Sequence, residues 1–366
     1  MKIARVESIP LSVPFDAGAS TPGFEGSDWR KLNVLLVRVE TEDGLVGWGD
    51  AFSYNCMRAV RAAVDDMVAP GVIGQDAGDI AGIARRLQQA LHLFGRYGIT
   101  MFALSGLDIA LWDLAGKAAG MPLHRLLGGA VRNRIPAYAS LFRYRVPEVV
   151  AERCAAALAD GFRHVKLHET REPEIEAARD ALGPGVPMMI DTNCPWTPTE
   201  ALAHARLFED YDPYWLEEPI FPPEDFAALA RLRAESGLPI AAGENACTAY
   251  EFEKMLAAEA VTFAQPSVTK VGGITEMMRI AALVRARGVS LMPHSPYFGP
   301  GFLATLQVAA ALPEESLIER FYLQPEGSLY GDWIDAVDGH FRVPDGPGLG
   351  VEPDPDVIRA YRVEGS

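Results

Sequence analysis

The sequence predicts an α/β protein in which a small α+β unit precedes a barrel of alternating strands and helices. Three observations predict this fold. The first 50 residues alternate between apolar and polar side chains, a helical stretch follows, and eight short apolar runs then recur with room for a helix in each gap. A chain of 366 residues is long enough for a large barrel with an accessory domain.

The N-terminal part is expected to form an antiparallel sheet covered by helices. IARVESIPLSV and KLNVLLVRVETEDGLVGWGD alternate as strands do, with a turn at Glu42, Asp43 and Gly44. A Gly/Ser/Pro-rich loop lies between them. Helical periodicity then runs from about residue 58 to 128 and is clearest in TMFALSGLDIALWDLAGKAAG.

After Gly129 the apolar runs are short and evenly spaced. They are IPAYASL, HVKLH, PMMIDTN, YWLEEP, PIAAGEN, VTFAQPS, VSLMPHS and SLIERFY. The gaps hold amphipathic segments such as PPEDFAALARLRAESG, so the pattern is typical of a (β/α)8 barrel. A doubly wound sheet of eight strands is the structural alternative.

Composition limits the possible partners and the compartment. The net charge of −16 argues against binding to nucleic acid or to an anionic membrane, since both require a basic surface. The four cysteines are far apart and form no C-x-x-C pair, which is typical of a reducing compartment. We see no signal peptide and expect no apolar stretch of about 20 residues that could span a bilayer. A cytoplasmic protein is therefore expected.

Reactive side chains follow the predicted strands, where barrel enzymes carry their active sites. In strand order they are Lys166 and His168, Asp191 and Asn193, Glu217 and Glu218, Glu244 and Asn245, His294, and finally Glu319 and Arg320.

Three of these acids, Asp191, Glu217 and Glu244, lie one per strand–helix unit and should converge at the barrel mouth. Carboxylate oxygens with open positions left over suit Mg2+, with Mn2+ as a possible substitute. The alternative is that each acid caps a helix, but two of them are glutamates, which are poor caps. Strand alternation lets only one of Glu217 and Glu218 face the barrel axis.

The motifs IDTN, WLEEP and AAGEN, followed by QPSVTKVGGIT, PHSP and LIER, resemble the enolase superfamily in its mandelate racemase subgroup. ALSGLDIALWDLAGK and DGPGLGV fit as well, so the resemblance covers essentially the whole chain. It implies a modified TIM barrel, (β/α)7β, over residues 129–325, whose first strand departs from the eightfold pattern. It also implies an α+β capping domain over 1–128, a segment 326–366 that packs back on it, and a homo-oligomer.

The resemblance assigns roles to the acids. Asp191, Glu217 and Glu244 become the Mg2+ ligands, Glu319 hydrogen-bonds the enolising carboxylate of the substrate, and Asn193 lines the site. The chemistry requires such a site, because a proton α to a carboxylate is very weakly acidic and the developing charge needs stabilisation. Members of this superfamily use a lysine or histidine base together with Mg2+ that stabilises the enediolate.

The sequence departs from the family at the end of the second strand, where relatives usually carry K-x-K. Here Lys166 is followed by Leu167 and His168. Lys166 would neutralise the substrate carboxylate, with its pKa lowered by the nearby metal. His168 would exchange the proton, since its ordinary pKa is close to working pH. The alternative for His168 is a partly buried histidine bonded to a backbone carbonyl.

A second departure concerns His294, which in many relatives is oriented by an aspartate at the end of the sixth strand. The matching residue is Ser267, which carries no charge to stabilise an imidazolium. His294 should therefore be less basic than its counterparts and should donate a proton to a leaving hydroxyl. Lys270 either adds positive potential to the site or is a surface lysine.

These expectations combine into dehydration of an acid sugar to a 2-keto-3-deoxy acid, with His168 or His294 removing the α-proton. Racemisation or epimerisation uses the same two bases and remains open. A barrel glycosidase and a non-catalytic metal-binding protein are the rivals from other classes. Substrate specificity should come from the loop 15–30 and from nearby polar and aromatic residues, and points to a polyhydroxylated anion. The candidates are Phe15, Asp16, Trp29, Arg30, Tyr54, Arg143 and Tyr144.

Overall fold

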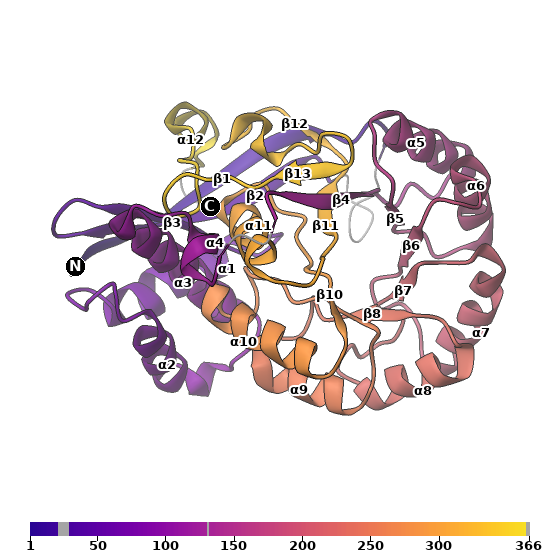
Figure 1. Ribbon diagram of the computed structural model, residues 1–366, viewed down its shortest axis with the longest axis horizontal. Coiled ribbons are helices and arrows are strands. Elements are labelled where there is room, and N and C mark those ends of the chain that lie inside the picture. The colour runs from indigo at the N-terminus through magenta and orange to yellow at the C-terminus, as the bar shows by residue number, and fades with distance from the viewer. Residues whose placement is uncertain (21–28, 130–131, 364–366) are drawn as a thin grey trace.

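The computed structural model describes residues 1–20, 29–129 and 132–363. The part of the loop 15–30 that spans residues 21–28 lies outside the described residues. Figure 1 shows a ring of strands and helices, the barrel, beside a unit built from the N-terminal third of the chain. Both predicted parts of the fold are present.

The capping unit is a four-stranded sheet covered by helices. Its strands have the order β12-β1-β2-β3, with β1 (Ile3–Asp16), β2 (Lys31–Thr41) and β3 (Val46–Ala51) antiparallel as predicted. The helices that follow are α1 (Met57–Ala62), η2 (Ala63–Val68), η3 (Ala69–Gly71), α2 (Ile80–Ala90), η4 (His92–Phe94), α3 (Ile99–Ala119) and α4 (Leu123–Leu126). A Cβ added at Gly49 would lie 2.0 Å from the carbonyl oxygen of Gly106, so glycine allows α3 to pack directly on β3.

Helix α3 corrects one expectation. Its 21 residues are long and apolar enough to cross a membrane by length and composition, although no such stretch was expected from the sequence. The helix is mostly buried between the cap sheet and the barrel helix α10, and Asp108 and Asp113 lie within it. Its apolar character is therefore that of a core helix.

All eight predicted barrel strands form. They are β4 (Arg134–Ser140), β5 (Val165–Leu167), β6 (Met188–Asp191), β7 (Trp215–Glu217), β8 (Ile240–Ala242), β9 (Phe263–Ala264), β10 (Ser290–Leu291) and β11 (Ile318–Phe321). They pair in parallel in the order β10-β9-β8-β7-β6-β5-β4-β11. The connecting helices are α5 (Pro147–Ala159), α6 (Glu172–Leu182), α7 (Pro198–Phe208) with η5 (Glu209–Tyr211), α8 (Phe226–Ser236), α9 (Thr248–Ala257), α10 (Gly273–Ala286) and α11 (Pro300–Ala311).

The barrel departs from the eightfold pattern at its last unit. Strand β11 leads into β12 (Gln324–Pro325), which pairs with β1 of the cap, where an eightfold barrel would have a helix. The first strand departs too, because β4 also pairs antiparallel with β13 (His340–Arg342). Two hydrogen bonds join the loop after β10 to β11: the backbone N–H of Ser295 donates to the carboxylate of Glu319 at 3.3 Å, and the backbone N–H of Glu319 donates to the hydroxyl of Ser295 at 3.2 Å. The (β/α)7β description is correct.

The C-terminal segment runs across both units. After η6 (Gly331–Ile334) and β13, helix α12 (Pro355–Tyr361) lies near β1. The backbone N–H of Val363 donates to the carbonyl of Pro10 at 3.0 Å. The cap sheet and the carboxyl ends of the barrel strands together line a cavity.

Candidate active site

The cavity between cap and barrel has a volume of about 350 Å3. Cap residues line one side, and the ends of β4, β5, β6, β8, β9, β10 and β11 with their loops line the other. Of the residues predicted for the site, the cavity wall includes Tyr54, Arg143, His168, Asn193, Glu244, Lys270, His294 and Glu319. Lys166, Asp191, Glu217 and Ser267 are buried directly behind this wall.

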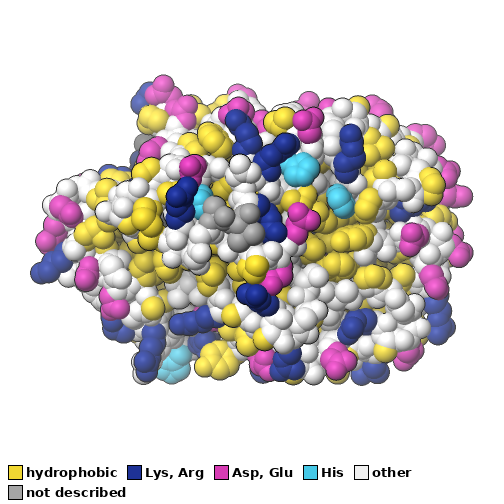
Figure 2. All heavy atoms as spheres, viewed as in Figure 1, with side chains coloured by type: hydrophobic (Ala, Val, Ile, Leu, Met, Phe, Trp, Pro, Cys, Tyr) yellow, Lys and Arg dark blue, Asp and Glu magenta, His cyan; other side chains and the backbone are white. Residues whose placement is uncertain are grey.

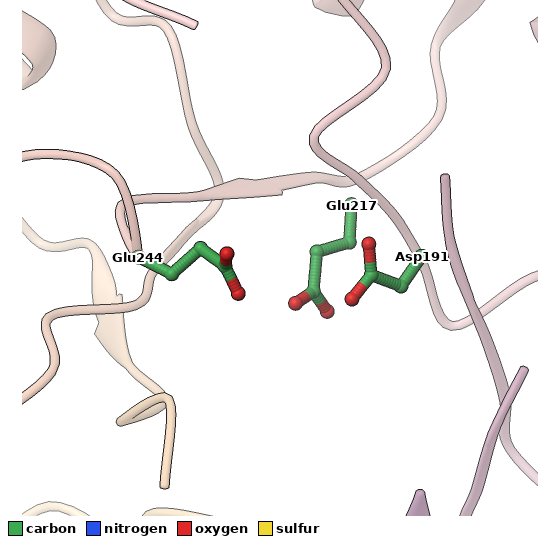
Figure 3. A group of neighbouring side chains, drawn as sticks. All are labelled: Asp191, Glu217 and Glu244. Carbon is green, nitrogen blue, oxygen red and sulfur yellow. The ribbon is translucent and has the colours of Figure 1, made fainter. Parts of the chain in front are cut away.

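Asp191, Glu217 and Glu244 converge as predicted. Each offers one carboxylate oxygen, and these oxygens lie within 4.8 Å of one another. Figure 3 shows Glu217 between the other two, with the three carboxylates turned toward a common space. Asp191 and Glu217 end neighbouring strands and are paired in register, whereas Glu244 follows β8 by two residues.

Neighbouring side chains fix these carboxylates. The indole Nε1 of Trp215 donates to Glu217 at 2.8 Å, and both the backbone N–H and the side-chain amide of Asn193 donate to Asp191 at 3.0 Å. Glu218 turns away, and its carboxylate accepts a 2.7 Å hydrogen bond from Asn245. The expected division between Glu217 and Glu218 therefore holds in the structure.

Lys166 is buried among three acids. Its Nζ lies 3.2 Å from Asp191, 3.0 Å from Glu217 and 3.1 Å from Glu319. Burial alone would lower the pKa of Lys166, but the carboxylates together raise it well above its ordinary value. The expected lowering of the pKa refers to the metal-bound site and stays a prediction, whereas in the metal-free chain the acids set the direction.

The same contacts shift the carboxylates in different directions. Burial opposes ionisation of Asp191, yet Lys166 and His168 lower its pKa. The pKa of Glu244 is likewise lowered, to about 2, by His294 and Lys270 against the effect of burial. Burial and the charge of Asp191 raise the pKa of Glu217 well above its ordinary value. In the metal-free chain the ammonium of Lys166, although it lies 3.0 Å away, does not offset the effect of burial and of Asp191 on the pKa of Glu217.

His168 makes the backbone contact expected for the alternative interpretation and also lies at the cavity wall. Its Nδ1 is bonded to the backbone carbonyl of Leu141, and its Nε2 lies 3.3 Å from Oδ2 of Asp191 at the cavity wall. A carbonyl oxygen only accepts hydrogen bonds, so Nδ1 carries a hydrogen and Nε2 is the nitrogen that is free to exchange a proton. The backbone bond orients the ring toward the site.

His294 lies at the other end of the carboxylate group. Its Nε2 is 2.7 Å from Glu244, and its Nδ1 is 3.2 Å from the hydroxyl of Ser267. Ser267 thus occupies the position expected for the orienting aspartate, which would form a His-Asp dyad with this histidine. A second hydroxyl, that of Tyr297, lies 3.2 Å from the same Nδ1 and contacts Ser267. The sequence interpretation missed Tyr297, although it follows His294 by only three residues in the same loop.

Lys270 and Arg143 add positive charge. Lys270 lies 3.9 Å from Glu244 and 4.8 Å from the ring centre of Phe52, and it is buried, which excludes a surface role. The guanidinium of Arg143 donates to the backbone carbonyls of His168 and Thr192 and, at 3.0 Å, to the side chain of Asn193. Arg143 thus ties the loops after β5 and β6 together.

The specificity candidates divide into two groups. Trp29, Tyr54 and Arg143 line the cavity, and the rings of Trp29 and Tyr54 pack on each other at 4.5 Å between centres. The remaining candidates, Phe15, Asp16, Arg30 and Tyr144, are not part of the cavity wall; Phe15 stacks behind it on Phe142, and Tyr144 donates to the carbonyl of Ala17. Aromatic residues that were not predicted complete the wall: Phe52, Phe142, Tyr297, Phe298 and Phe321.

Comparison with known families is consistent with this geometry. Residues 149–357 match the family model described as enolase C-terminal domain-like, and residues 27–128 match the N-terminal domain of mandelate racemase and muconate lactonizing enzyme. The chain belongs to the enolase superfamily. Its place in the superfamily is the mandelate racemase and muconate lactonizing subgroup, as the sequence motifs predicted.

Relatives within the superfamily are metabolic enzymes. D-galactarolactone cycloisomerase of Agrobacterium fabrum is 36% identical and covers 99% of both chains. Arabinonate dehydratase of Saccharolobus solfataricus is 33% identical over 93% of both. A mandelate racemase/muconate lactonizing protein of Paracoccus denitrificans, solved with magnesium, superposes with a TM-score of 0.87 at 30% identity and covers 99% of this chain and 98% of that one.

Proposed function

We propose that the protein removes the α-proton of an acid sugar at a Mg2+ site and expels an oxygen from the β-carbon, which gives a 2-keto-3-deoxy acid. One observation carries the proposal. The two histidines contact the two outer carboxylates, His168 at Asp191 and His294 at Glu244, and both line one cavity. Two proton-transfer groups therefore flank the place where a metal-bound carboxylate would lie.

The residues at the carboxylate group fit a divalent cation. Asp191, Glu217 and Glu244 supply only oxygen donors, which Mg2+ prefers, and in the metal-free chain Lys166 alone does not offset the effect of burial and of Asp191 on the pKa of Glu217. Mg2+ bound there would act as a Lewis acid on the substrate carboxylate, and Mn2+ would serve as a substitute. Solved relatives from Paracoccus denitrificans and Streptomyces coelicolor carry magnesium, which supports this choice.

The other site residues bind the substrate carboxylate, stabilise the developing charge and transfer protons. Lys166 presents a buried positive charge toward the substrate carboxylate. Glu319, 3.1 Å from Lys166, stabilises the negative charge that develops there when its carboxyl is protonated and donates a hydrogen bond. Nε2 of His168 takes the α-proton. His294 gives a proton to the departing β-oxygen, because the hydroxyl of Ser267 orients its ring without stabilising an imidazolium as a carboxylate would.

The cavity wall suits a polyhydroxylated anion. Arg143, Asn193, Lys270 and Tyr54 bring hydrogen-bond donors to it from both the barrel and the cap. Dehydratases of arabinonate, galactonate and gluconate are 32–33% identical relatives, and their substrates are acids of this kind. We therefore assign the substrate to the aldonic and aldaric acids and their close derivatives.

Cycloisomerisation is the second candidate. The aromatic rings of Trp29, Phe142 and Phe321 form an apolar face within the cavity, which suits the C–H groups of a closed sugar ring. In that reaction the departing β-oxygen belongs to the ring of the substrate. The relative from Agrobacterium fabrum acts on a galactarolactone by its name. Epimerisation, the alternative from the sequence, would return the proton to carbon.

We further propose the domain division 1–128, 129–325 and 326–366, a cytoplasmic location and a homo-oligomeric state. No nucleic-acid or membrane partner is proposed, because the net charge is −16. Figure 2 shows acidic and basic side chains interspersed over one face. Sedimentation of the purified protein measures the oligomeric state directly.

A panel of aldonic acids, aldaric acids and their lactones tests the function. Each is incubated with Mg2+ and followed by NMR. A 2-keto-3-deoxy product from an open-chain acid supports dehydration, and the same product from a lactone with ring opening supports cycloisomerisation. An inverted α-carbon without elimination would instead establish epimerisation. Failure of every acid, despite binding of Mg2+, would refute the proposed function.

A further inference from the structure

We propose that Tyr297 and Ser267 act as a pair of positioning residues for His294, replacing the charged residue of the His-Asp dyad with two neutral hydroxyls. They aim Nε2 of His294 into the cavity and add no negative charge. The catalytic role of this pair rests on the proposed function, whereas the orientation of the His294 ring does not depend on it.

The geometry brings three groups into mutual contact. The hydroxyls of Ser267 and Tyr297 each lie 3.2 Å from Nδ1 of His294, and they also contact each other. Ser267 is fully buried in the loop after β9, and Tyr297 lies in the loop that leads from β10 to α11. Two hydroxyls from separate loops therefore hold one ring nitrogen.

The chemistry of the ring nitrogens follows from their partners. Nε2 faces a carboxylate oxygen of Glu244 at 2.7 Å, and a carboxylate accepts hydrogen bonds, so Nε2 carries a hydrogen. A hydroxyl oxygen accepts from Nδ1–H when the ring is charged and can donate to Nδ1 when it is bare. The hydroxyl pair can therefore bind Nδ1 in either state without adding the negative charge that a carboxylate would bring.

The Tyr297 side chain remains neutral and is anchored by the cap. Burial raises the pKa of its phenol, so the group adds no charge to the site. Its ring meets that of His294 edge-on at 5.8 Å and that of Phe52, a cap residue, at 6.4 Å between centres. The cap therefore helps to fix the residue that orients His294.

The elimination that this arrangement serves accounts for every proton and electron pair. As the α-proton passes to Nε2 of His168, the electron pair of the C–H bond forms the carbon–carbon double bond. The electron pair of the C–O bond leaves with the β-oxygen, which takes the proton from Nε2 of His294. Solvent exchange returns one proton to His294 and removes one from His168. The reaction needs no oxidant or reductant.

Four variants test the pairing with the acid found in the panel. Tyr297→Phe and Ser267→Ala should each lower kcat for elimination about 10-fold, with KM changed less than about twofold, because only the orientation of the proton donor is lost. Ser267→Thr keeps the hydroxyl and should restore kcat. Tyr250→Phe, at an exposed tyrosine on α9, is the matched control and should behave as the native protein.

A second readout separates positioning from general damage. In D2O, exchange of the α-proton depends on His168 and should persist in Tyr297→Phe, so that the ratio of exchange to elimination rises. Unchanged kcat and ratio in both Tyr297→Phe and Ser267→Ala would overturn the proposal. A parallel fall of exchange and elimination would do so as well, because it would show a structural role only.

A crystal structure of the Ser267→Ala/Tyr297→Phe double variant decides the inference without any substrate. The proposal predicts that the imidazole of His294 rotates away from Glu244 or adopts several orientations. An imidazole that keeps its orientation would contradict the proposal, even if an acid from the panel is turned over. Conversely, if no acid is turned over but the ring is displaced, the proposed function fails and the positioning role stands.

Discussion

Nζ of Lys166 lies 3.1 Å from Oε1 of Glu319, although the two residues belong to β5 and β11, which are separated by β4. The contact spans the interior of the barrel mouth. It links the lysine to the strand that ends the barrel, while the same ammonium group also contacts Asp191 and Glu217. Lys166 is therefore the common counter-ion of the metal-free site.

Replacement of Lys166 by Met should destabilise the metal-free protein. The change keeps the apolar stem but leaves buried carboxylates without their cation, and loss of one partner from a buried ion pair costs about 3–5 kcal/mol. Urea unfolding without Mg2+ measures this loss. Addition of Mg2+ should recover part of it, because a bound cation replaces the missing charge. Lys254→Met, at an exposed residue of α9, is the control; equal stability of the two variants would contradict the role of Lys166.

Two adjacent glutamates provide a matched test of the metal site. Glu217→Gln should weaken Mg2+ binding by more than about 100-fold, since it removes a ligand and not merely a supporting contact. Glu218→Gln should change binding less than about tenfold, because that side chain faces Asn245. Isothermal titration calorimetry measures both affinities. If Glu218→Gln weakened Mg2+ binding more than Glu217→Gln did, the assignment of Glu217 as the metal ligand would be wrong.

Asp50 should make stability depend on pH. It lies in β3 and is buried against the start of α11, where its carboxyl accepts a hydrogen bond from the backbone N–H of Gly301, and burial raises its pKa to about 7. The native state then holds a proton that the unfolded chain releases. The stability that this proton gives is complete below about pH 4 and is lost as the pH rises to about 7.

The variant Asp50→Asn removes this titration. Relative to the native protein, its free energy of unfolding should rise by about 1.4 kcal/mol per pH unit between pH 4 and 7. Urea unfolding at several pH values measures the difference, with Asp65→Asn, at an exposed position, as the control. A difference that is flat over this range would show that the carboxyl of Asp50 titrates normally.

The sequence predicted the barrel strands well because their signal is local. Each apolar run is short, is followed by a polar residue and is separated from the next by one amphipathic helix, as in HVKLH and PMMIDTN. The three acids were predictable for the same reason, since parallel strands bring their carboxyl ends to one edge. Strand alternation predicted that only one of Glu217 and Glu218 faces the barrel axis, and the family resemblance indicated Glu217.

Contacts between distant segments were not predictable in this way. Tyr297 lies near His294 in the chain, but its contact with Ser267 depends on how two loops fold. The aromatic wall joins Trp29 of the cap with Phe142 and Phe321 of the barrel, and no periodicity marks that assembly. The pKa of Lys166 also depended on three acids from different strands, which outweigh the burial of the lysine.

The central claim is that a proton leaves the α-carbon and that His168 takes it. The direct test uses an acid from the panel deuterated at C2, incubated with the native protein, His168→Ala and His294→Ala, each with Mg2+ and with a chelator. We predict that the native protein and His294→Ala release the C2 deuteron to solvent only with Mg2+, and that His168→Ala slows the release by about 100-fold or more. A product that retains the C2 deuteron, or release that is unaffected by the loss of His168, would contradict this claim.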